Sequence, residues 1–388
     1  MGNRVLAKVD GLLPGIRARA VRADQQRRVP EDTIGELTAA GVFRMLQPKR
    51  YGGYESGLAE AYEVVRAIAG ACPSTGWVSA VLGIHPWQIA LFDEQAQDEV
   101  WKDDPDILVS SSYAPTGKLM EVDGGYRLSG RWSFSSGSDY CRWALLGALC
   151  PSEDGKAPEY LTVLVPRTDY VVEDVWNVVG LSGTGSNDIV IDRTFVPWHR
   201  AFSALDQNLL RGPGHKVNTA PLYKLPFGMV FSYAITSAIL GATQGAYDAH
   251  IERMQARVRL SYGGQKVADD PFAHVRVARA AGEIDAALLA LDYNVAEQTR
   301  YVEAGEELPE RLRLRARRDQ VLGIERALRA VEMLFDNSGG HSLELGNPIE
   351  RHWRDVHAGS VHVINDVERA LAMYGRGEFG VTINEGMY

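Results

Sequence analysis

Residues 122–137, VDGGYRLSGRWSFSSG, decide the fold of this chain because they place a hairpin signal in the middle of an otherwise helical sequence. The Asp123-Gly124 pair is typical of a two-residue β-turn, and strand-like residues lie on either side of it. Further strand candidates follow at short intervals, at residues 143–149, 160–165 and 189–191. We therefore predict a small β-barrel or sandwich over residues 108–210.

The regions that flank this segment show helical spacing. Before it, Pro30 followed by Glu31 is a helix-start signal, and residues 75–92 are apolar on most sides, as in a buried helix. After it, apolar side chains recur every three or four residues from Val277 to Val295 and beyond. The chain is thus predicted to be mainly α with a central β domain. An N-terminal helical domain (1–107) and a C-terminal four-helix bundle (211–388) would enclose the β-barrel (108–210).

Composition argues against several classes of partner. Acidic residues outnumber basic ones, 50 to 41, and the formal net charge is −9, so no nucleic-acid or anionic membrane surface is expected. The densest basic run, residues 311–318, alternates with apolar residues, and we interpret it as a solvated helix face. No apolar run of about 18 residues suggests a membrane span. The three cysteines form no CxxC pair, which favours reduced thiols in a cytoplasmic protein.

Two possible motifs fail on their context. Three glycines between residues 180 and 185 resemble a nucleotide loop, but a strand follows them where such a loop requires a helix, so we predict a β-turn. His352, His357 and His362 are five residues apart, and on one helix this spacing turns each by about 140° from the last. They would therefore not converge on one ion, and we predict no metal site.

Three segments carry a resemblance to a known family. They are STGWV (74–78) with HPW (85–87), SSSYAP (110–115) with GRWSFSSG (130–137), and RHWRD (351–355) with the histidines that follow it. Together they resemble the group D flavin-dependent monooxygenases of the acyl-CoA dehydrogenase superfamily. Within that group the segments are most similar to the 4-monooxygenases of the phenolic 9,10-secosteroid (3-hydroxy-9,10-secoandrosta-1,3,5(10)-triene-9,17-dione) in steroid degradation. The resemblance runs from residue 12 to 379 and implies the acyl-CoA dehydrogenase fold, a homotetramer and a separate NAD(P)H:flavin reductase.

The resemblance also implies a reaction. Reduced flavin (FMNH2 or FADH2) and O2 would give a C4a-hydroperoxyflavin, and an ionised phenol would attack its distal oxygen to give a catechol. Such a site needs a shelf for the flavin ring and a hydrogen-bond partner near flavin N5. It also needs a base for a phenol of pKa about 10 and walls that exclude water.

Catalytic and cofactor-binding residues follow from the same resemblance. His85 with Ser111 would deprotonate the phenol, Ser136 would hydrogen-bond near N5, and His362 would donate to the peroxide or the flavin. Cofactor binding is predicted for a further set, which comprises Trp77, Ser112, Tyr113, Phe134, Ser135, Arg257, Gly340 and His341. Arg257, in the first bundle helix, would contact the flavin phosphate of its own or a neighbouring subunit, and the Gly340-His341 loop would reach the flavin tail. His357 is a weaker alternative to His362 because helical geometry turns it away.

Other interpretations stay open at this point. From the residues alone, His85 fits a buried core position, Ser136 a barrel rim and Arg257 an exposed helix face. An acyl-CoA dehydrogenase or oxidase is the main alternative, but residues 360–364 lack the catalytic glutamate of those enzymes. A non-catalytic helical assembly protein is another. Ser138 and Tyr140 stand where secosteroid hydroxylases tend to have Cys and His, so another aromatic substrate, such as a polyketide, is possible.

Overall fold

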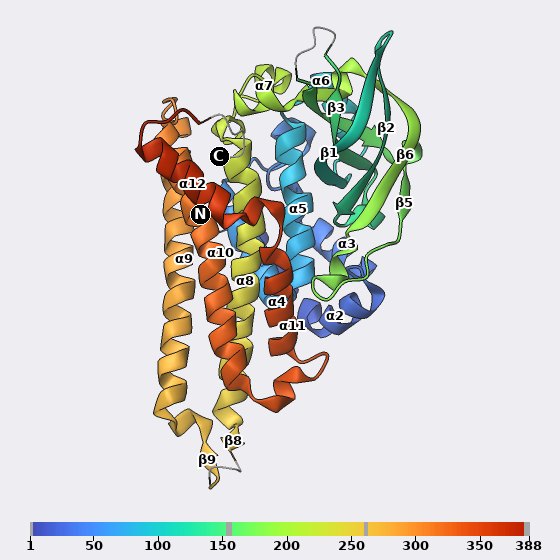
Figure 1. Cartoon of the computed structure of the whole chain (residues 1–388). Helices are drawn as coiled ribbons and strands as arrows, with labels where there is room; N and C mark the ends of the chain where they lie inside the picture. Colours follow the sequence, from blue (N-terminus) through green and yellow to red (C-terminus); the bar gives the residue numbers. More distant parts are fainter. Residues whose placement is uncertain (1–2, 153–156, 260–262, 384–388) are drawn as a thin grey trace.

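Helices come first, a β-sheet follows, and long helices complete the chain in the computed structural model, which describes residues 3–152, 157–259 and 263–383 (Figure 1). The N-terminal helices are α1 (Arg4–Asp10), α2 (Leu13–Gln26), α3 (Glu31–Ala40), α4 (Leu58–Ala71), α5 (Pro73–Ile89) and α6 (Glu94–Trp101). The predicted order of helices, sheet and helices is confirmed.

Helix α5 runs through the middle of the molecule. It packs against α4, against strand β1 (Val109–Val122) and against the first long helix, α8 (Phe227–Ala256). Every residue of α5 except Gly83 is buried, as its sequence predicts, because a helix that is apolar on all sides is stable only when it is covered on all sides. Any polar side chain on α5 is therefore held in a dry environment between the sheet and the bundle.

The β domain is one sheet of seven strands in the order β5-β6-β2-β1-β3-β4-β7. The strands after β1 are β2 (Gly125–Ser135), β3 (Trp143–Cys150), β4 (Glu159–Pro166), β5 (Val171–Glu173), β6 (Asn187–Pro197) and β7 (Ala201–Ser203). The β1–β2 hairpin turns at Asp123-Gly124, where Gly124 has the left-handed φ of +79° that such a turn requires. Only the pairing of β1 with β3 is parallel; the other pairings in this sheet are antiparallel. Short helix α7 (Ala204–Asn208) follows β7.

The glycine-rich segment between β5 and β6 is a tight turn, as predicted, and it joins the sheet to the bundle. A short 3-10 helix, η5 (Ser182–Thr184), lies within it. The Leu181 N–H donates to Asp355 Oδ1 at 2.6 Å. A Cβ on Gly180 would lie 2.6 Å from the Arg354 carbonyl oxygen, so only glycine allows this close approach.

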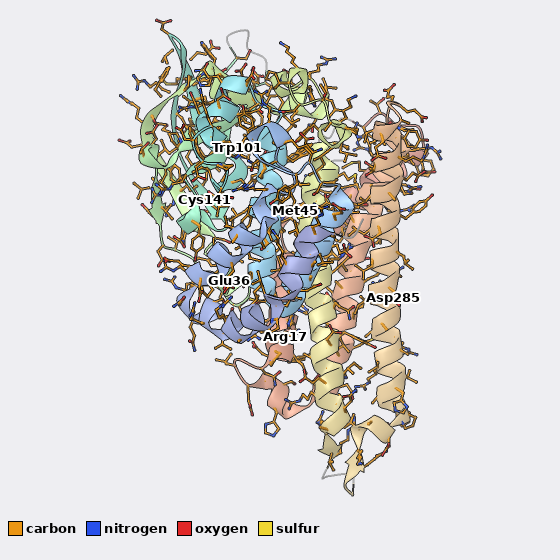
Figure 2. All side chains as sticks on the ribbon, turned by 180° about the vertical axis from the view of Figure 1, so that it is seen from behind. Arg17, Glu36, Met45, Trp101, Cys141 and Asp285 are labelled. Carbon is orange, nitrogen blue, oxygen red and sulfur yellow. The ribbon has the colours of Figure 1, made fainter. Side chains whose placement is uncertain are left out.

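After α7, the described part of the chain forms the helices α8, α9 (Pro271–Glu303), α10 (Glu310–Ser338), α11 (Pro348–Ser360) and α12 (Val367–Glu378). The short strands β8 (Val258–Arg259) and β9 (Gln265–Lys266) lie at the far end of α8 and α9, away from the sheet (Figure 1). Figure 2 shows α9, labelled at Asp285, on the opposite side of the molecule from the β domain, in which Cys141 is labelled. None of the described helices is long and apolar enough to cross a membrane.

One expectation about the bundle is wrong in part. Arg311 is exposed, and Arg313, Arg315 and Arg318 are half-buried, as a solvated face requires, but Arg317 is only 6% exposed. It shares a buried face of α10 with Leu314 and Val321, three and four residues away, and the alternating charges did not reveal this burial.

Candidate active site

His85 is a buried imidazole with one free nitrogen. It lies on α5, and its Nδ1 is 2.5 Å from the carbonyl oxygen of Val109 at the start of β1. Because a carbonyl can only accept, Nδ1 carries the hydrogen and Nε2 has a bare lone pair. Nε2 is buried without a hydrogen-bond partner among the described residues. Burial lowers the pKa of His85 to about 4, so the ring is neutral near pH 7 and offers a proton acceptor.

Ser111 and Tyr113 lie near His85 on β1. Side chains at positions two apart on a strand share a face, so Val109, Ser111 and Tyr113 point the same way. The Tyr113 ring lies 6.3 Å from the His85 ring, and the Ser111 hydroxyl acts on the pKa of Tyr113 in the direction opposite to burial. The structure therefore places His85, the predicted base on α5, against the face of β1 that carries Ser111, the predicted serine.

Tyr113 is held in place by a pair of glutamines. Its hydroxyl donates to Gln88 Oε1 on α5, and Gln88 Nε2 donates to Gln207 Oε1 on α7 at 2.9 Å. Burial raises the pKa of Tyr113, so its hydroxyl stays protonated. The phenol ring of Tyr113 is thus a fixed wall of the site.

Aromatic rings connect the two predicted catalytic histidines. The Tyr113 ring lies 5.4 Å from Phe231 on α8, and Phe231 lies 6.0 Å from His362. His362 in turn lies 5.7 Å from Trp77 on α5. Phe227, one turn before Phe231, stacks on it at 5.5 Å. A continuous row of aromatic ring contacts therefore connects His85 to His362.

His362 does not lie on a helix, contrary to the prediction from its spacing. Helix α11 ends at Ser360, and His362 caps a 3-10 turn, η12 (Val363–Asn365). Its Nδ1 accepts a hydrogen bond from the Ile364 N–H at 3.2 Å, so the hydrogen of the neutral ring is on Nε2. Burial, and the charge of Arg317, lower the pKa of His362 to about 4. His362 therefore offers a neutral N–H donor.

His357 points elsewhere. Its Nε2 lies 2.8 Å from a carboxylate oxygen of Glu332 on α10, and its Nδ1 lies 2.7 Å from the Trp353 carbonyl. Within residues 3–152, 157–259 and 263–383, no group of three or more His, Cys, Asp or Glu side chains is arranged to hold a metal ion. The helical argument for separating the histidines fails for His362, because the helix ends before it, but His357 still makes contacts of its own.

Ser136 ends a chain of buried hydroxyls. Trp77 Nε1 donates to Ser136 Oγ at 3.2 Å, and Ser136 Oγ pairs with Ser186 Oγ at 2.8 Å. Ser186 pairs with Thr184 at 2.7 Å, and Thr184 donates to the Leu181 carbonyl at 2.8 Å. Because that carbonyl can only accept, each hydroxyl donates along the chain toward Leu181. Ser136 is left with one free lone pair and is an acceptor.

The neighbouring predicted cofactor residues show two kinds of environment. Ser112 Oγ donates to the Ser133 carbonyl at 2.7 Å, while Ser135 Oγ is fully buried without a partner in the described ranges. Phe134 is 68% exposed at a left-handed φ of 67°, with its ring 6.0 Å from Trp176. A bulky residue in this conformation is strained, and such strain concentrates at functional sites.

The remaining predicted cofactor residues lie far from this cluster. Arg257 directly follows α8 instead of lying within it, and its Nη1 donates to the Asn337 carbonyl at 3.0 Å beside the Gly340 turn. His341 is exposed and pairs with Glu344 at 2.6 Å. About 26 residues of α8 separate Phe231 from Arg257, which at 1.5 Å per residue is about 39 Å. The two groups cannot contact one flavin ring system within a single chain.

Family comparisons agree with this architecture. The family model for the acyl-CoA dehydrogenase N-terminal domain matches residues 15–102, and that for the C-terminal domain matches residues 233–367. These matches, with the sheet between them, define an acyl-CoA dehydrogenase fold.

Individual relatives narrow the class. The chain is 49% identical, over 98% of its length and 100% of the relative, to the flavin-dependent monooxygenase oxygenase subunit HsaA of Rhodococcus jostii. It is 36% identical, over 97% of its length and 94% of the relative, to the oxygenase component of the FADH2-dependent resorcinol hydroxylase of a Rhizobium species. The crystal structure of 3-HSA hydroxylase from Rhodococcus sp. RHA1 superposes with a TM-score of 0.94, at 48% identity, and covers 99% of both chains. The chain belongs to the flavin-dependent monooxygenases of the acyl-CoA dehydrogenase superfamily.

Several residues of this cluster were not predicted from the sequence. Phe227 and Phe231 follow Pro226 at the start of α8 with a spacing of four, a signal that was available but that is equally typical of an ordinary core. Thr184 and Ser186 belong to the glycine turn, which the sequence identified only as a structural element. Arg317 was interpreted as solvent-exposed.

Proposed function

We propose that this chain is the oxygenase component of a two-component monooxygenase that ortho-hydroxylates a phenol to a catechol, with a secosteroid phenol as the expected substrate. The observation that carries the proposal is the pair of neutral histidines with opposite hydrogen positions, connected by aromatic rings. His85 presents a bare nitrogen and His362 an N–H. A base and a donor on either side of a planar ring are what this reaction requires of the protein.

His85 is the proposed base. Its Nε2 would take the phenol proton, with Ser111 holding the substrate oxygen on the same face of β1. The low pKa of the free ring does not oppose this role, because the phenolate formed beside it favours the imidazolium by opposite charge. Phe231 and Tyr113 would line the ring of the substrate and exclude water. Ionisation makes the ortho and para ring carbons nucleophilic, and the orientation of the ring between His85 and His362 would select the ortho carbon.

The second group of residues fits a reduced flavin. When bound, reduced flavin supplies two electrons to O2, so that one oxygen atom enters the phenol ring and the other leaves as water. Ser136 has a free lone pair that would accept from the N5–H of the reduced form, and His362 would donate from Nε2 to the oxygen that becomes negative. Ser135 Oγ, buried without a partner in the described ranges, and exposed Phe134 would hold the ring system.

A homotetramer would complete the site. The 39 Å separation along α8 places Arg257, Gly340 and His341 out of reach of the flavin ring of their own chain, so a neighbouring subunit would supply them to the flavin tail. The outer face of α9 supports an interface, since it exposes large apolar side chains: Phe272 (76%), Val275 (51%), Leu289 (72%) and Tyr293 (60%). A separate NAD(P)H:flavin reductase would supply the cofactor, and this requirement places the reaction in the cytoplasm.

Coupled turnover tests the proposal. The purified chain would be supplied with NADH, a separate flavin reductase and FMN or FAD, and O2 uptake and catechol would be measured for a panel of phenols that includes a secosteroid phenol. We expect phenol-dependent catechol formation that requires the reductase. Reduction of a dye by acyl-CoA thioesters, without catechol from any phenol, would instead support the dehydrogenase alternative.

A further inference from the structure

Arg317 is a buried cation whose charge is not paired. It lies on α10, is 6% exposed, and forms no ion pair with a carboxylate in the part of the chain that the structure describes. Its Nε is buried without a hydrogen-bond partner there. Removing an arginine from water without a counterion is costly, so such a residue usually has a specific role.

The side chain connects to the His362 segment through two amides. Arg317 Nη1 donates to Gln320 Oε1, and Gln320 Nε2 donates to Asn365 Oδ1 at 2.8 Å. Asn365 Nδ2 then donates to the Gly359 carbonyl at 2.9 Å, at the C-terminal end of α11. Arginine can only donate, which fixes the orientation of both amides and the direction of the whole chain.

This chain of amides shapes the turn that carries His362. With its side chain on Gly359, Asn365 caps the end of α11, and its own N–H donates to the His362 carbonyl at 2.7 Å. The His362 N–H donates to the Gly359 carbonyl at 3.2 Å. The compact turn brings the Ile364 N–H against His362 Nδ1. The position of the ring thus depends on a side chain from a different helix.

We propose that Arg317 is a positioning residue: through Gln320 and Asn365 it fixes the turn that holds the Ile364 N–H against His362 Nδ1, so that the ring hydrogen stays on Nε2, and its positive charge opposes a second proton on that ring. The proposal rests on the donor role of His362 in the proposed function. Protonation of Nδ1 would place two N–H groups against each other, since Ile364 already donates there, and would drive the ring out of position. A neighbouring cation prevents this in mildly acidic solution.

The groups that face His362 leave Arg317 as the main charge. From α5 and α8 it is faced by the uncharged rings of Trp77 and Phe231. From α10 it is faced by Arg317, whose charge acts on it. The carboxylate of Asp366, which caps α12, lies on the same segment and attracts Arg317 instead. Burial lowers the pKa of Arg317 to about 10, which leaves it charged near neutrality.

A titration of His362 in the flavin-free protein tests this proposal independently of catalysis. The ring would be followed by NMR with 13C,15N-labelled histidine, assigned by the signal that His362→Asn removes. In the native chain we expect a pKa below 5 with the hydrogen on Nε2. Arg317→Met should raise that pKa by up to about one unit, because burial is the larger of the two causes that lower it and Arg317 is the smaller. Gln320→Glu should raise it too, because a carboxylate would neutralise Arg317 and could not donate to Asn365.

Two further variants separate charge from structure. Arg317→Lys keeps the charge and should keep the low pKa. Arg315→Met removes a half-buried arginine two residues away that pairs with Glu297, and it should leave His362 unchanged. A His362 pKa near 6.5 in the native chain, or an unchanged pKa in folded Arg317→Met, would overturn the proposal. Failure of every phenol in the turnover assay, with the titration as expected, would instead count against the proposed function alone.

Discussion

Burial lowers the pKa of both His85 and His362, but the two rings carry their hydrogen on opposite nitrogen atoms. The pKa of each is lowered to about 4, so both rings are neutral near pH 7. His85 donates from Nδ1 to a carbonyl and keeps a bare Nε2, whereas His362 accepts at Nδ1 from an N–H and keeps its hydrogen on Nε2. One backbone group on the near side of each ring therefore decides whether the far side is a base or a donor.

The largest expected effect is at His85, the proposed base. Replacing His85 with Gln or Ala should slow hydroxylation at pH 7 by about 10²- to 10⁴-fold, the usual contribution of a general base. Glutamine should not rescue, since an amide cannot take a proton. The rate of either variant should recover as the pH approaches the phenol pKa of about 10, where the substrate ionises unaided. A pH-independent loss in single-turnover catechol formation would argue that His85 has only a structural role.

The same substitution, His85→Gln, should also change how the free energy of unfolding depends on pH. The folded-state pKa of His85 lies near 4, below the ordinary 6.5, so the unfolded chain takes up the proton first as the pH falls. The contribution to stability is thus complete above about pH 6.5 and is lost as the pH falls to 4. Chemical denaturation from pH 8 to 4 should show a loss smaller by up to about 3 kcal/mol in His85→Gln than in the native chain. Identical slopes would contradict the neutral buried state.

His362, the proposed donor, should differ from His85 in its response to glutamine. His362→Ala should lower the catechol formed per O2 consumed by about 10- to 150-fold, as a hydrogen bond to a charged partner contributes roughly 1.5–3 kcal/mol. His362→Gln should retain most of the coupling, because its amide can donate from about the position of Nε2. Hydrogen peroxide release, measured beside catechol, is the direct readout. Equal losses for Ala and Gln at this position would remove the distinction between the two histidines.

A mixing experiment tests whether the two distant groups of residues meet across subunits. Arg257→Ala should weaken reduced-flavin binding by about 10- to 150-fold, since a hydrogen bond to a charged phosphate is of similar strength. Co-expression of Arg257→Ala with His362→Ala chains should restore activity, because a site with intact His362 can take Arg257 from the other variant. No restoration, with mixed oligomers demonstrated by tagged purification, would place both groups in one subunit.

The smallest effect concerns the hydroxyl chain behind Ser136. Ser186→Ala frees the Ser136 hydrogen, so Ser136 can donate to oxidised flavin as well as accept from the reduced form. As an acceptor only, Ser136 should favour reduced flavin, which carries the N5 hydrogen, and in the variant this preference in equilibrium binding should fall by about 2- to 13-fold, the range for one neutral hydrogen bond. Thr162→Ala, at another buried hydroxyl of the β domain, is a matched control that should leave this ratio unchanged.

Sequence reasoning succeeded where local signals decide structure and failed where distant contacts do. The Asp123-Gly124 turn and the start of helix α3 at Glu31 follow from neighbouring residues alone. The end of α11 before His362 does not, because it depends on Asn365 reaching back and on Gln320 from another helix. The burial of Arg317 was not predicted either, because it too depends on contacts with distant parts of the chain.

In the candidate site, too, some features were predictable from the sequence and others were not. The residue types that the reaction needs were predicted through the family resemblance, and the structure brings His85, Ser111, Ser136 and His362 into one cluster. The hydrogen positions on the two imidazoles were not predictable, since they depend on the Val109 carbonyl and the Ile364 N–H, backbone groups that carry no sequence signal. The distance of Arg257 from the cluster was equally invisible.

The most direct test of the account is the hydrogen position on each ring. Nitrogen NMR of 15N-histidine-labelled protein at pH 7.5, without flavin, distinguishes a protonated from a bare ring nitrogen, and the His85→Gln and His362→Gln variants assign the two signals. We predict His85 protonated at Nδ1 and bare at Nε2, and His362 bare at Nδ1 and protonated at Nε2. The same tautomer on both rings, or a positively charged ring at either position, would contradict the assignment of one base and one donor.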